Sequence, residues 1–222
     1  MVVGMIIFPG LTQLDLTGPY DVLTRLQGTK VLLIAETMAV VKSDAGLVLT
    51  PDVAFDQAPQ VDILFVPGGR GVFEAMQNSR LIQFLQTQAA KAKYVTSVCT
   101  GALVLAAAGL LNGYKATTHW LSLHLLRLFK VDVVEERVVI DRNRITGGGV
   151  TAGIDFGLYL VSMVAGENAA KEIQLMMEYN PAPPFNAGSP HTAGENIVAR
   201  VVEQRKAVQE AREEMIKTKI LG

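Results

Sequence analysis

The chain has 222 residues, half of them apolar, with 20 basic and 21 acidic side chains and a formal net charge of −1. This length fits one α/β domain with a full core, and the near-neutral charge gives no electrostatic reason to bind nucleic acid or an anionic membrane. The single cysteine, Cys99, excludes an internal disulfide framework and leaves too few thiolates for a zinc site, so no metal is expected.

The first segment, residues 1–8, is apolar but lacks the basic flank and the small-residue cleavage site of a signal peptide. Two later apolar runs, 102–111 and 150–166, are shorter than a membrane span, and the second contains Asp155. These features predict a soluble cytoplasmic protein with no membrane partner.

The first 150 residues alternate short β-branched runs with longer helical patterns. The predicted strands are 2–8, 30–35, 61–66 and 94–98. Because these runs are continuously apolar, we expect both of their faces to be covered, as in a parallel sheet. Helical patterns lie near 18–27, 79–92 and 101–109, and Asn78 and Ser79 are candidate caps of the second.

Two segments are typical of hairpins. Residues 39–50 turn at Asp44–Gly46, and residues 137–147 turn at Asp141–Asn143. The alternation of strands and helices with short connections predicts a doubly wound α/β sandwich, in which helices flank a mostly parallel sheet.

The last third of the chain predicts more helix. Helical patterns lie near 151–165 and 168–178, and the prolines of segment 181–190 exclude a helix there. Residues 195–222 predict one long, highly charged helix with a narrow apolar stripe (Val198, Val201, Val208 and Met215) and a favourable Glu213–Lys217 pair. This helix packs on its own domain or forms an arm around a partner subunit. We treat 1–222 as a single domain.

Candidate chemistry lies at strand ends, because ligands of open α/β sheets bind outside the carboxyl ends of the strands. Cys99 directly follows the strand at 94–98 and precedes a helix, whose N-terminal dipole is expected to lower the thiol pKa. This arrangement resembles the nucleophile elbow of hydrolases, although the Gly-x-Ser-x-Gly form is absent. The alternative is a buried, inert cysteine.

Two other strand ends carry candidates. Gly68 and Gly69 follow the strand at 61–66, and their N–H groups can bind a developing negative charge, unless the loop merely needs a positive φ. Asp15 lies between Leu14 and Leu16, after the first strand. Beside a cysteine in an apolar crevice, its pKa would be raised and it could hold or pass a proton; as a helix cap or Asx turn it would be structural.

His119 and Trp120 follow a further short strand, as a candidate base and a candidate pocket wall. A histidine satisfied by the local backbone is the commoner case. The run Gly147–Gly149 opens the next helix and suits either anion binding or close packing. It matches neither the dinucleotide nor the nucleoside triphosphate motif.

Together these segments resemble the ThiJ/PfpI superfamily, which is related to the class I glutamine amidotransferases, and within it the isonitrile hydratases. The resemblance covers essentially the whole chain. It rests on Gln13-Leu-Asp-Leu-Thr-Gly-Pro19, Pro67-Gly-Gly69, Tyr94-Val-Thr-Ser-Val-Cys-Thr-Gly101, Ala116-Thr-Thr-His-Trp120, Thr146–Phe156 and Glu178–Pro190.

The resemblance implies that Cys99 is the nucleophile, Asp15 its acidic partner and Thr100 the residue that follows the cysteine in isonitrile hydratases. It implies addition of water to an isonitrile to give an N-substituted formamide, in a homodimer without metal or organic cofactor. Protease-like members carry His directly after the cysteine, so Thr100 argues against a Cys–His dyad.

Two other functions remain open. ThiJ/PfpI domains also form the sensing half of AraC-type regulators, but residues beyond 190 lack the turn signal and basic face of a helix-turn-helix region. A sensor of oxidants would have a peroxide-reactive Cys99 and no isonitrile turnover.

Overall fold

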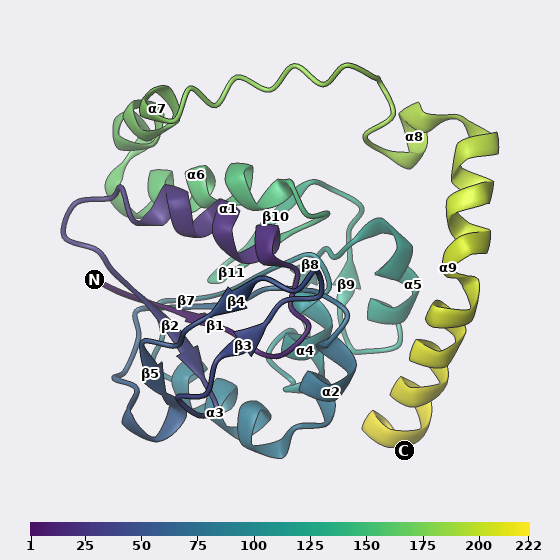
Figure 1. Ribbon diagram of the computed structural model, residues 1–222, viewed down its shortest axis with the longest axis horizontal. Helices are drawn as coiled ribbons and strands as arrows, with labels where there is room; N and C mark the ends of the chain where they lie inside the picture. The colour runs from purple at the N-terminus through teal and green to yellow at the C-terminus, as the bar shows by residue number, and fades with distance from the viewer.

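The computed structural model describes residues 1–222 and contains a seven-stranded sheet between two layers of helices (Figure 1). The strand order is β10-β11-β7-β6-β1-β2-β5, and all neighbours are parallel except β10, which is antiparallel to β11. The strands are β1 (Val2–Ile6), β2 (Lys30–Ala35), β5 (Val53–Ala54), β6 (Ile63–Val66), β7 (Tyr94–Val98), β10 (Val138–Asp141) and β11 (Arg144–Gly147). The predicted mostly parallel α/β architecture is confirmed.

Apolar side chains on both faces of the sheet explain the continuous apolar runs. All four residues of β6 are buried, as are the last four of β1. Helices α1 (Gln13–Leu23) and α6 (Ala152–Ala165) lie on one face of the sheet. Helices α2 (Val72–Gln77), α3 (Ser79–Ala89) and α4 (Gly101–Ala107) lie on the other.

Both predicted hairpins are present. Strands β3 (Val41–Lys42) and β4 (Val48–Leu49) pair antiparallel. The β10–β11 pair turns through Arg142, whose φ is +54°. Short elements connect the main ones: η1 (Phe55–Gln57), β8 (Lys115–Ala116), η2 (Trp120–Ser122), α5 (Leu123–Leu126) and β9 (Asp132–Val133). The strand β8 is the short strand predicted before His119, and the sequence indicated none of the others.

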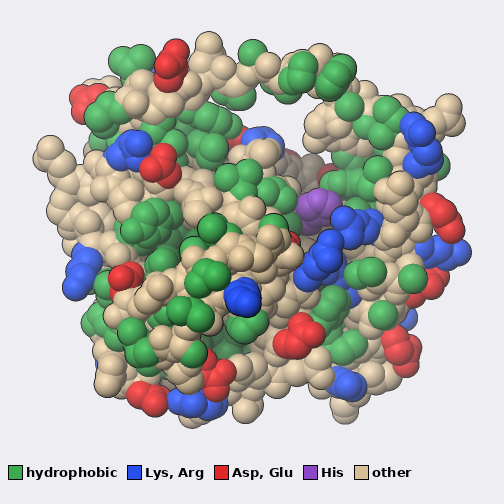
Figure 2. Space-filling view, viewed as in Figure 1, with side chains coloured by type: hydrophobic (Ala, Val, Ile, Leu, Met, Phe, Trp, Pro, Cys, Tyr) green, Lys and Arg blue, Asp and Glu red, His purple; other side chains and the backbone are tan.

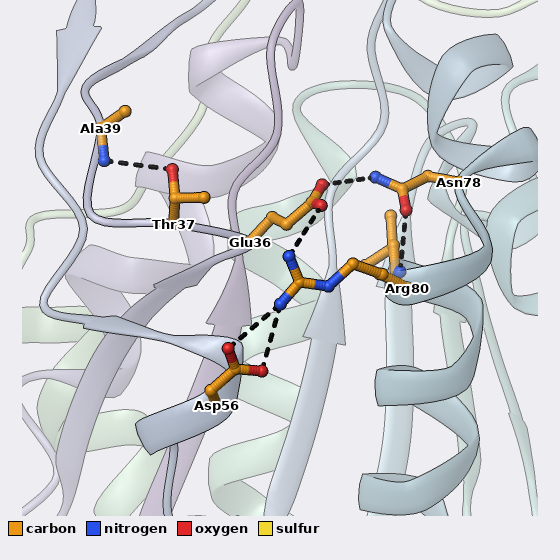
Figure 3. Close-up of polar contacts among 7 residues, drawn as sticks. Glu36, Thr37, Ala39, Asp56, Asn78 and Arg80 are labelled. Carbon is orange, nitrogen blue, oxygen red and sulfur yellow. Dashed lines mark hydrogen bonds and ion pairs between the residues drawn. The ribbon is translucent and has the colours of Figure 1, made fainter.

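The start of α3 confirms the expected cap and is tied to neighbouring loops (Figure 3). The Asn78 side chain accepts a 3.1 Å hydrogen bond from the Leu81 N–H and donates a 2.7 Å bond to Glu36. Arg80 bridges Glu36 at 3.4 Å and Asp56 at 3.1 Å. Because these side chains are substantially exposed, the ion pairs orient the helix more than they stabilise it.

Helix α1 begins at Gln13, five residues earlier than the predicted start at residue 18. A helix that starts at residue 18 has Pro19 in its first turn, where proline is tolerated, but Pro19 lies inside the observed helix, which packs against α6. A Cβ at Gly153 of α6 would lie 2.9 Å from Pro19 Cδ, so this glycine permits the close approach of the two helices. As a result, Asp15 lies in the first turn of a helix.

The C-terminal region contains α7 (Glu167–Met176), α8 (Pro190–Ala193), the long helix α9 (Glu195–Met215) and a π-helical turn, η3 (Ile216–Ile220). An extended segment, 177–189, runs from α7 to α8 (Figure 1). The proline-rich segment is non-helical up to Ser189, as predicted. Pro190 instead starts α8. Its missing N–H has no consequence there, because the N–H of the first helical residue has no partner within the helix.

The end of α9 packs on its own chain. Ile216 is fully buried, and the Arg212 guanidinium lies 4.4 Å from the centre of the Phe73 ring of α2. Most of the remaining helix is exposed, and the expected Glu213–Lys217 ion pair has a distance of 2.6 Å. No helix combines the length and the apolar content of a membrane span.

Candidate active site

Three predicted segments meet where the strand order of the sheet reverses. Strand β1 lies between β2 and β6, so the chain leaves β1 toward one edge and later returns on its other side. The connections after β1, β6 and β7 carry Asp15, the Gly68–Gly69 pair and Cys99. All three therefore lie at the carboxyl ends of adjacent parallel strands, the usual ligand position in such sheets.

Cys99 occupies a backbone conformation that non-glycine residues rarely adopt. Its φ is +55°, between the end of β7 and the start of α4. The Cys99 N–H donates to the Gly147 carbonyl at 3.0 Å, and the Cys99 carbonyl accepts a 2.8 Å hydrogen bond from Thr118 Oγ1. These two bonds hold the strained residue, which is 6% exposed. Within the Gly147–Gly149 run, Gly147 therefore supports the site through its carbonyl, which accepts the bond from the Cys99 N–H.

Asp15 is fully buried beside this cysteine. Its Oδ2 accepts a 3.1 Å hydrogen bond from the Gly68 N–H. The neighbouring Cys99 thiol acts to lower the pKa of this carboxyl, and Oδ1 has no hydrogen-bond partner. Asp15 therefore has one oxygen fixed by the backbone and one without a hydrogen-bond partner.

Thr100 completes the arrangement. Its hydroxyl oxygen accepts a 3.0 Å bond from the Gly69 N–H, while its hydroxyl and its N–H both act to lower the pKa of the Cys99 thiol. A Cβ at Gly68 would lie 2.6 Å from Thr100 N and Oγ1 and 2.8 Å from Asp15 Oδ2, so only glycine fits. The N–H groups of Gly68 and Gly69 thus hold Asp15 and Thr100, whereas the sequence suggested that they face a developing charge.

Burial controls the ionisation of the pair. It raises the pKa of Asp15 from 3.8 to about 7, the direction expected from the sequence, although the thiol and the Gly68 N–H act in the opposite direction. Burial, and then the Asp15 carboxylate, raise the pKa of the Cys99 thiol well above its usual range. The helix dipole was expected to lower the pKa of this thiol; desolvation and the adjacent carboxylate reverse that direction. Near neutral pH the two groups therefore carry at most one negative charge.

A cavity of about 400 Å³ lies against Cys99 and Thr100. Its lining comes from the connections after β6 and β7, from the region around η2, and from α9, which contributes Arg205, Val208, Gln209 and Arg212. Figure 2 shows Lys or Arg side chains beside a histidine on the face between the sheet and α9. None of these four α9 residues was predicted from the sequence to line the site, and Val208 was expected only in the apolar stripe. A usable signal was present, because Arg212 follows Val208 by four positions and so interrupts the apolar stripe.

His119 lines this cavity, whereas Trp120 lines two neighbouring ones. The Nδ1 atom of His119 accepts a 3.3 Å bond from the Leu121 N–H, as in a histidine satisfied by local backbone. Burial, followed by the charges of Arg212 and Arg205, lowers the pKa of His119 to about 4. The ring is therefore neutral near pH 7, with its hydrogen on Nε2, and is a donor rather than an effective base.

A cavity of about 850 Å³, larger than the one against Cys99, lies between β10, α6 and α7. None of the predicted residues Cys99, Asp15, Thr100, Gly68, Gly69, His119 and Trp120 lines it. No group of three or more His, Cys, Asp or Glu side chains lies close enough together to hold a metal ion.

Comparisons with known proteins agree with the fold. A model of the DJ-1/PfpI family matches residues 1–163. Isonitrile hydratase from Pseudomonas putida is 50% identical over 196 residues, covering 88% of this chain and 86% of that protein. The crystal structure of a ThiJ/PfpI family protein from Pseudomonas syringae matches with a TM-score of 0.94 and 42% identity, covering 96% of this chain and 89% of that chain.

Proteins with other names share the fold. The HTH-type transcriptional regulator GbdR from Pseudomonas aeruginosa is 38% identical over 136 residues, which cover 60% of this chain but 37% of the regulator. The crystal structure of DJ-1beta from Drosophila melanogaster matches with a TM-score of 0.73 and 25% identity, covering 80% of this chain and 97% of that chain. Since one fold hosts several roles, function must be argued from the site.

Proposed function

This chain belongs to the DJ-1/PfpI family, and from that premise we propose that it hydrates isonitriles to N-substituted formamides, with Cys99 as the nucleophile. The observation that carries the proposal is the buried Asp15 carboxyl, with a pKa of about 7, beside the Cys99 thiol. The 50% identity to a protein named isonitrile hydratase supports the same reaction.

The first step adds the thiol across the isonitrile carbon. This carbon has a lone pair and a formal negative charge, so it accepts a sulfur nucleophile only if it also gains a proton. The Asp15 carboxylate takes the proton from Cys99 and passes it to the carbon while the sulfur–carbon bond forms. The product is a thioimidate, in which carbon bears hydrogen, sulfur and a C=N bond.

The second step adds water to the thioimidate. A water molecule gives its oxygen to the carbon and a proton to the nitrogen, with Asp15 as the group that relays the proton. The tetrahedral adduct then releases the formamide as the carbon–sulfur bond breaks, and the sulfur regains its proton. The net reaction is one isonitrile plus one water, and the thiol and the carboxyl are restored.

The other site residues are assigned supporting roles. The Thr100 hydroxyl and N–H stabilise charge on the sulfur as it attacks and leaves, because both act to lower the pKa of the Cys99 thiol. Gly68 and Gly69 position Asp15 and Thr100 through their N–H groups. The neutral His119 offers its Nε2–H to the substrate or to the attacking water.

The test follows formamide formation from cyclohexyl isocyanide. We expect turnover by the wild-type protein, complete loss in C99A, and a reduction of at least 100-fold in D15N. Intact mass spectrometry of the wild-type protein, quenched during turnover, should show an adduct equal in mass to one isonitrile, and C99A should show none. Turnover that survives C99A would contradict the thioimidate, and absence of turnover in the wild type would contradict the function.

We further propose that the chain acts as one domain in a cytoplasmic homodimer. Apolar side chains on α6, on α7 and in the extended segment are strongly exposed: Tyr159 (52%), Leu175 (81%), Met176 (65%) and Phe185 (78%). Large apolar side chains exposed to this degree support a surface that a partner subunit covers. A lone nucleophilic thiol fits a reducing compartment. Light scattering of the purified protein tests the dimer, and a monomer at micromolar concentration would contradict it.

The oxidant-sensor alternative has less support. Peroxide reacts with thiolates, and the buried Cys99 thiol is held protonated near neutral pH. Slow oxidation of Cys99 by peroxide, compared with fast modification by isonitrile, would separate the two functions.

A further inference from the structure

One side of the Cys99 cavity has a chemical character that isonitrile hydration alone does not use. Arg70, which follows β6, and Arg205 and Arg212 of α9 line it. None of these three guanidinium groups has an Asp or Glu within 4.0 Å. The acidic residue in the lining, Asp44, accepts a 2.6 Å bond from Thr12 Oγ1. The cavity therefore has an excess of positive charge.

Arg212 is the most constrained of these residues. Its side chain is 9% exposed, its guanidinium packs over the Phe73 ring, and its Nε–H is buried without a hydrogen-bond partner. Burial and the charges of Arg205 and Arg70 lower its pKa, while the nearby Cys99 acts in the opposite direction. A buried cation without a counterion is costly, so an anion in the cavity would relieve that cost.

Two further buried polar atoms in the same lining lack partners. They are the Ser122 hydroxyl oxygen and the Gln209 amide oxygen. Buried polar groups in folded proteins are nearly always paired, so a cluster of unpaired ones marks a place where a ligand or ordered water binds. Three residues that line one cavity therefore have polar atoms that the surrounding protein does not pair.

We propose that the arginine-lined side of the cavity binds a carboxylate carried by the isonitrile substrate, so that the preferred substrates are isonitriles with an acidic group. This inference rests on the proposed function. The neutral isonitrile group reaches Cys99, and the carboxylate pairs with Arg212, which can present two parallel N–H donors. Phe73, Leu121 and Val208 provide apolar surface for the carbon chain between the two ends. The cavity of about 400 Å³ suits a small molecule.

The experiment compares ω-isocyanocarboxylates of increasing chain length with their methyl esters, which have the same isonitrile group and no charge. The readout is the ratio of kcat/KM for each carboxylate to that for its ester. For the best chain length we expect a ratio of at least 10 in the wild-type protein, arising mainly from a lower KM. We expect the ratio to fall as ionic strength rises.

Substitutions of single arginines test which residues cause the preference for the carboxylate over its ester. R212Q and R205Q should each lower the carboxylate-to-ester ratio, R212Q by at least tenfold, while R212K should retain part of the preference. Arg205 is exposed, so R205Q tests the inference even if R212Q folds poorly. The matched control is R200Q, on an exposed part of the same helix outside the cavity, which should keep the wild-type ratio.

The outcomes separate the two proposals. If neither esters nor carboxylates are hydrated, the proposed function fails. If esters and carboxylates react equally well, or R212Q slows both by the same factor, the carboxylate inference is overturned while hydration stands. The equal slowing would instead indicate that Arg212 acts on the Cys99 sulfur.

Discussion

Replacing Asp15 by Asn should change protein stability in a way that depends on pH. The folded protein holds the pKa of Asp15 at about 7, whereas the unfolded chain has the ordinary value of 3.8. Between these values the folded state binds more protons, so stability falls as pH rises from about 4 to 7. At about 1.4 kcal/mol for each pH unit, the complete loss is about 4 kcal/mol, of which about 2–3 kcal/mol falls between pH 5 and pH 8.

Asn cannot ionise, so D15N escapes this loss. Its amide oxygen can still accept the bond from the Gly68 N–H. The free energy of unfolding of D15N minus that of the wild type should therefore be about 2–3 kcal/mol larger at pH 8 than at pH 5. Urea unfolding at the two pH values measures this difference. The pH effects of groups that do not interact with Asp15 are common to both proteins and cancel. Burial, the largest cause of the raised pKa of Cys99, remains in D15N and keeps this thiol protonated in the folded state at both pH values.

The control is a carboxyl group whose surroundings lower its pKa. Hydrogen bonding to the Val2 N–H, with help from Lys93, lowers the pKa of Asp62. Asp62 is therefore ionised at both pH values, and the effect of D62N should be the same at pH 5 and pH 8. If D15N also had equal effects at both pH values, Asp15 would titrate at its ordinary pKa and the reasoning from burial would be wrong.

Three further predictions concern the same site. The kcat/KM for isonitrile hydration should rise with pH through about 7, because the pair is inactive when both groups are protonated, and a flat profile from pH 5 to pH 9 would contradict the role of Asp15. G68A should lose at least 100-fold in kcat/KM because of the clashes at Thr100 and Asp15, whereas G188A, whose Cβ meets open space, should match the wild type. T118V should cost about 1–3 kcal/mol in urea unfolding, because it leaves the buried Cys99 carbonyl unpaired, and T118S should restore most of it.

The sequence predicted the fold well because its strongest signals are local. The continuous apolar strands, the cap at Asn78 and the two hairpins depend on neighbouring residues, and each appears where the pattern placed it. The start of α1 was missed because it depends on a distant contact. Pro19 is tolerated within the helix where it packs against Gly153, and no local pattern reports that contact.

The candidate site likewise has residues that the sequence indicated and residues that only distant contacts bring to the site. Strand ends indicated Cys99, Asp15 and Gly68, because topology alone brings the ends of adjacent parallel strands together. The direction of the thiol pKa was wrong, since the helix dipole is visible in the sequence while the degree of desolvation is not. Arg212 is more than a hundred residues from Cys99, and only the packing of α9 on Phe73 brings it to the cavity.

The raised thiol pKa also bears on which reaction this site suits. A cysteine activated as a free thiolate has already lost the proton that an isonitrile carbon must receive. The Cys99–Asp15 pair instead keeps one proton near neutral pH, because burial and mutual repulsion prevent both groups from ionising. That proton lies where the sulfur attacks, so nucleophile and acid reach the same carbon together. A site built this way favours addition of S–H across one atom over attack on a carbonyl, which needs donors directed at an oxyanion. The N–H groups of Gly68 and Gly69, which could have provided such donors, are already bonded to Asp15 and Thr100.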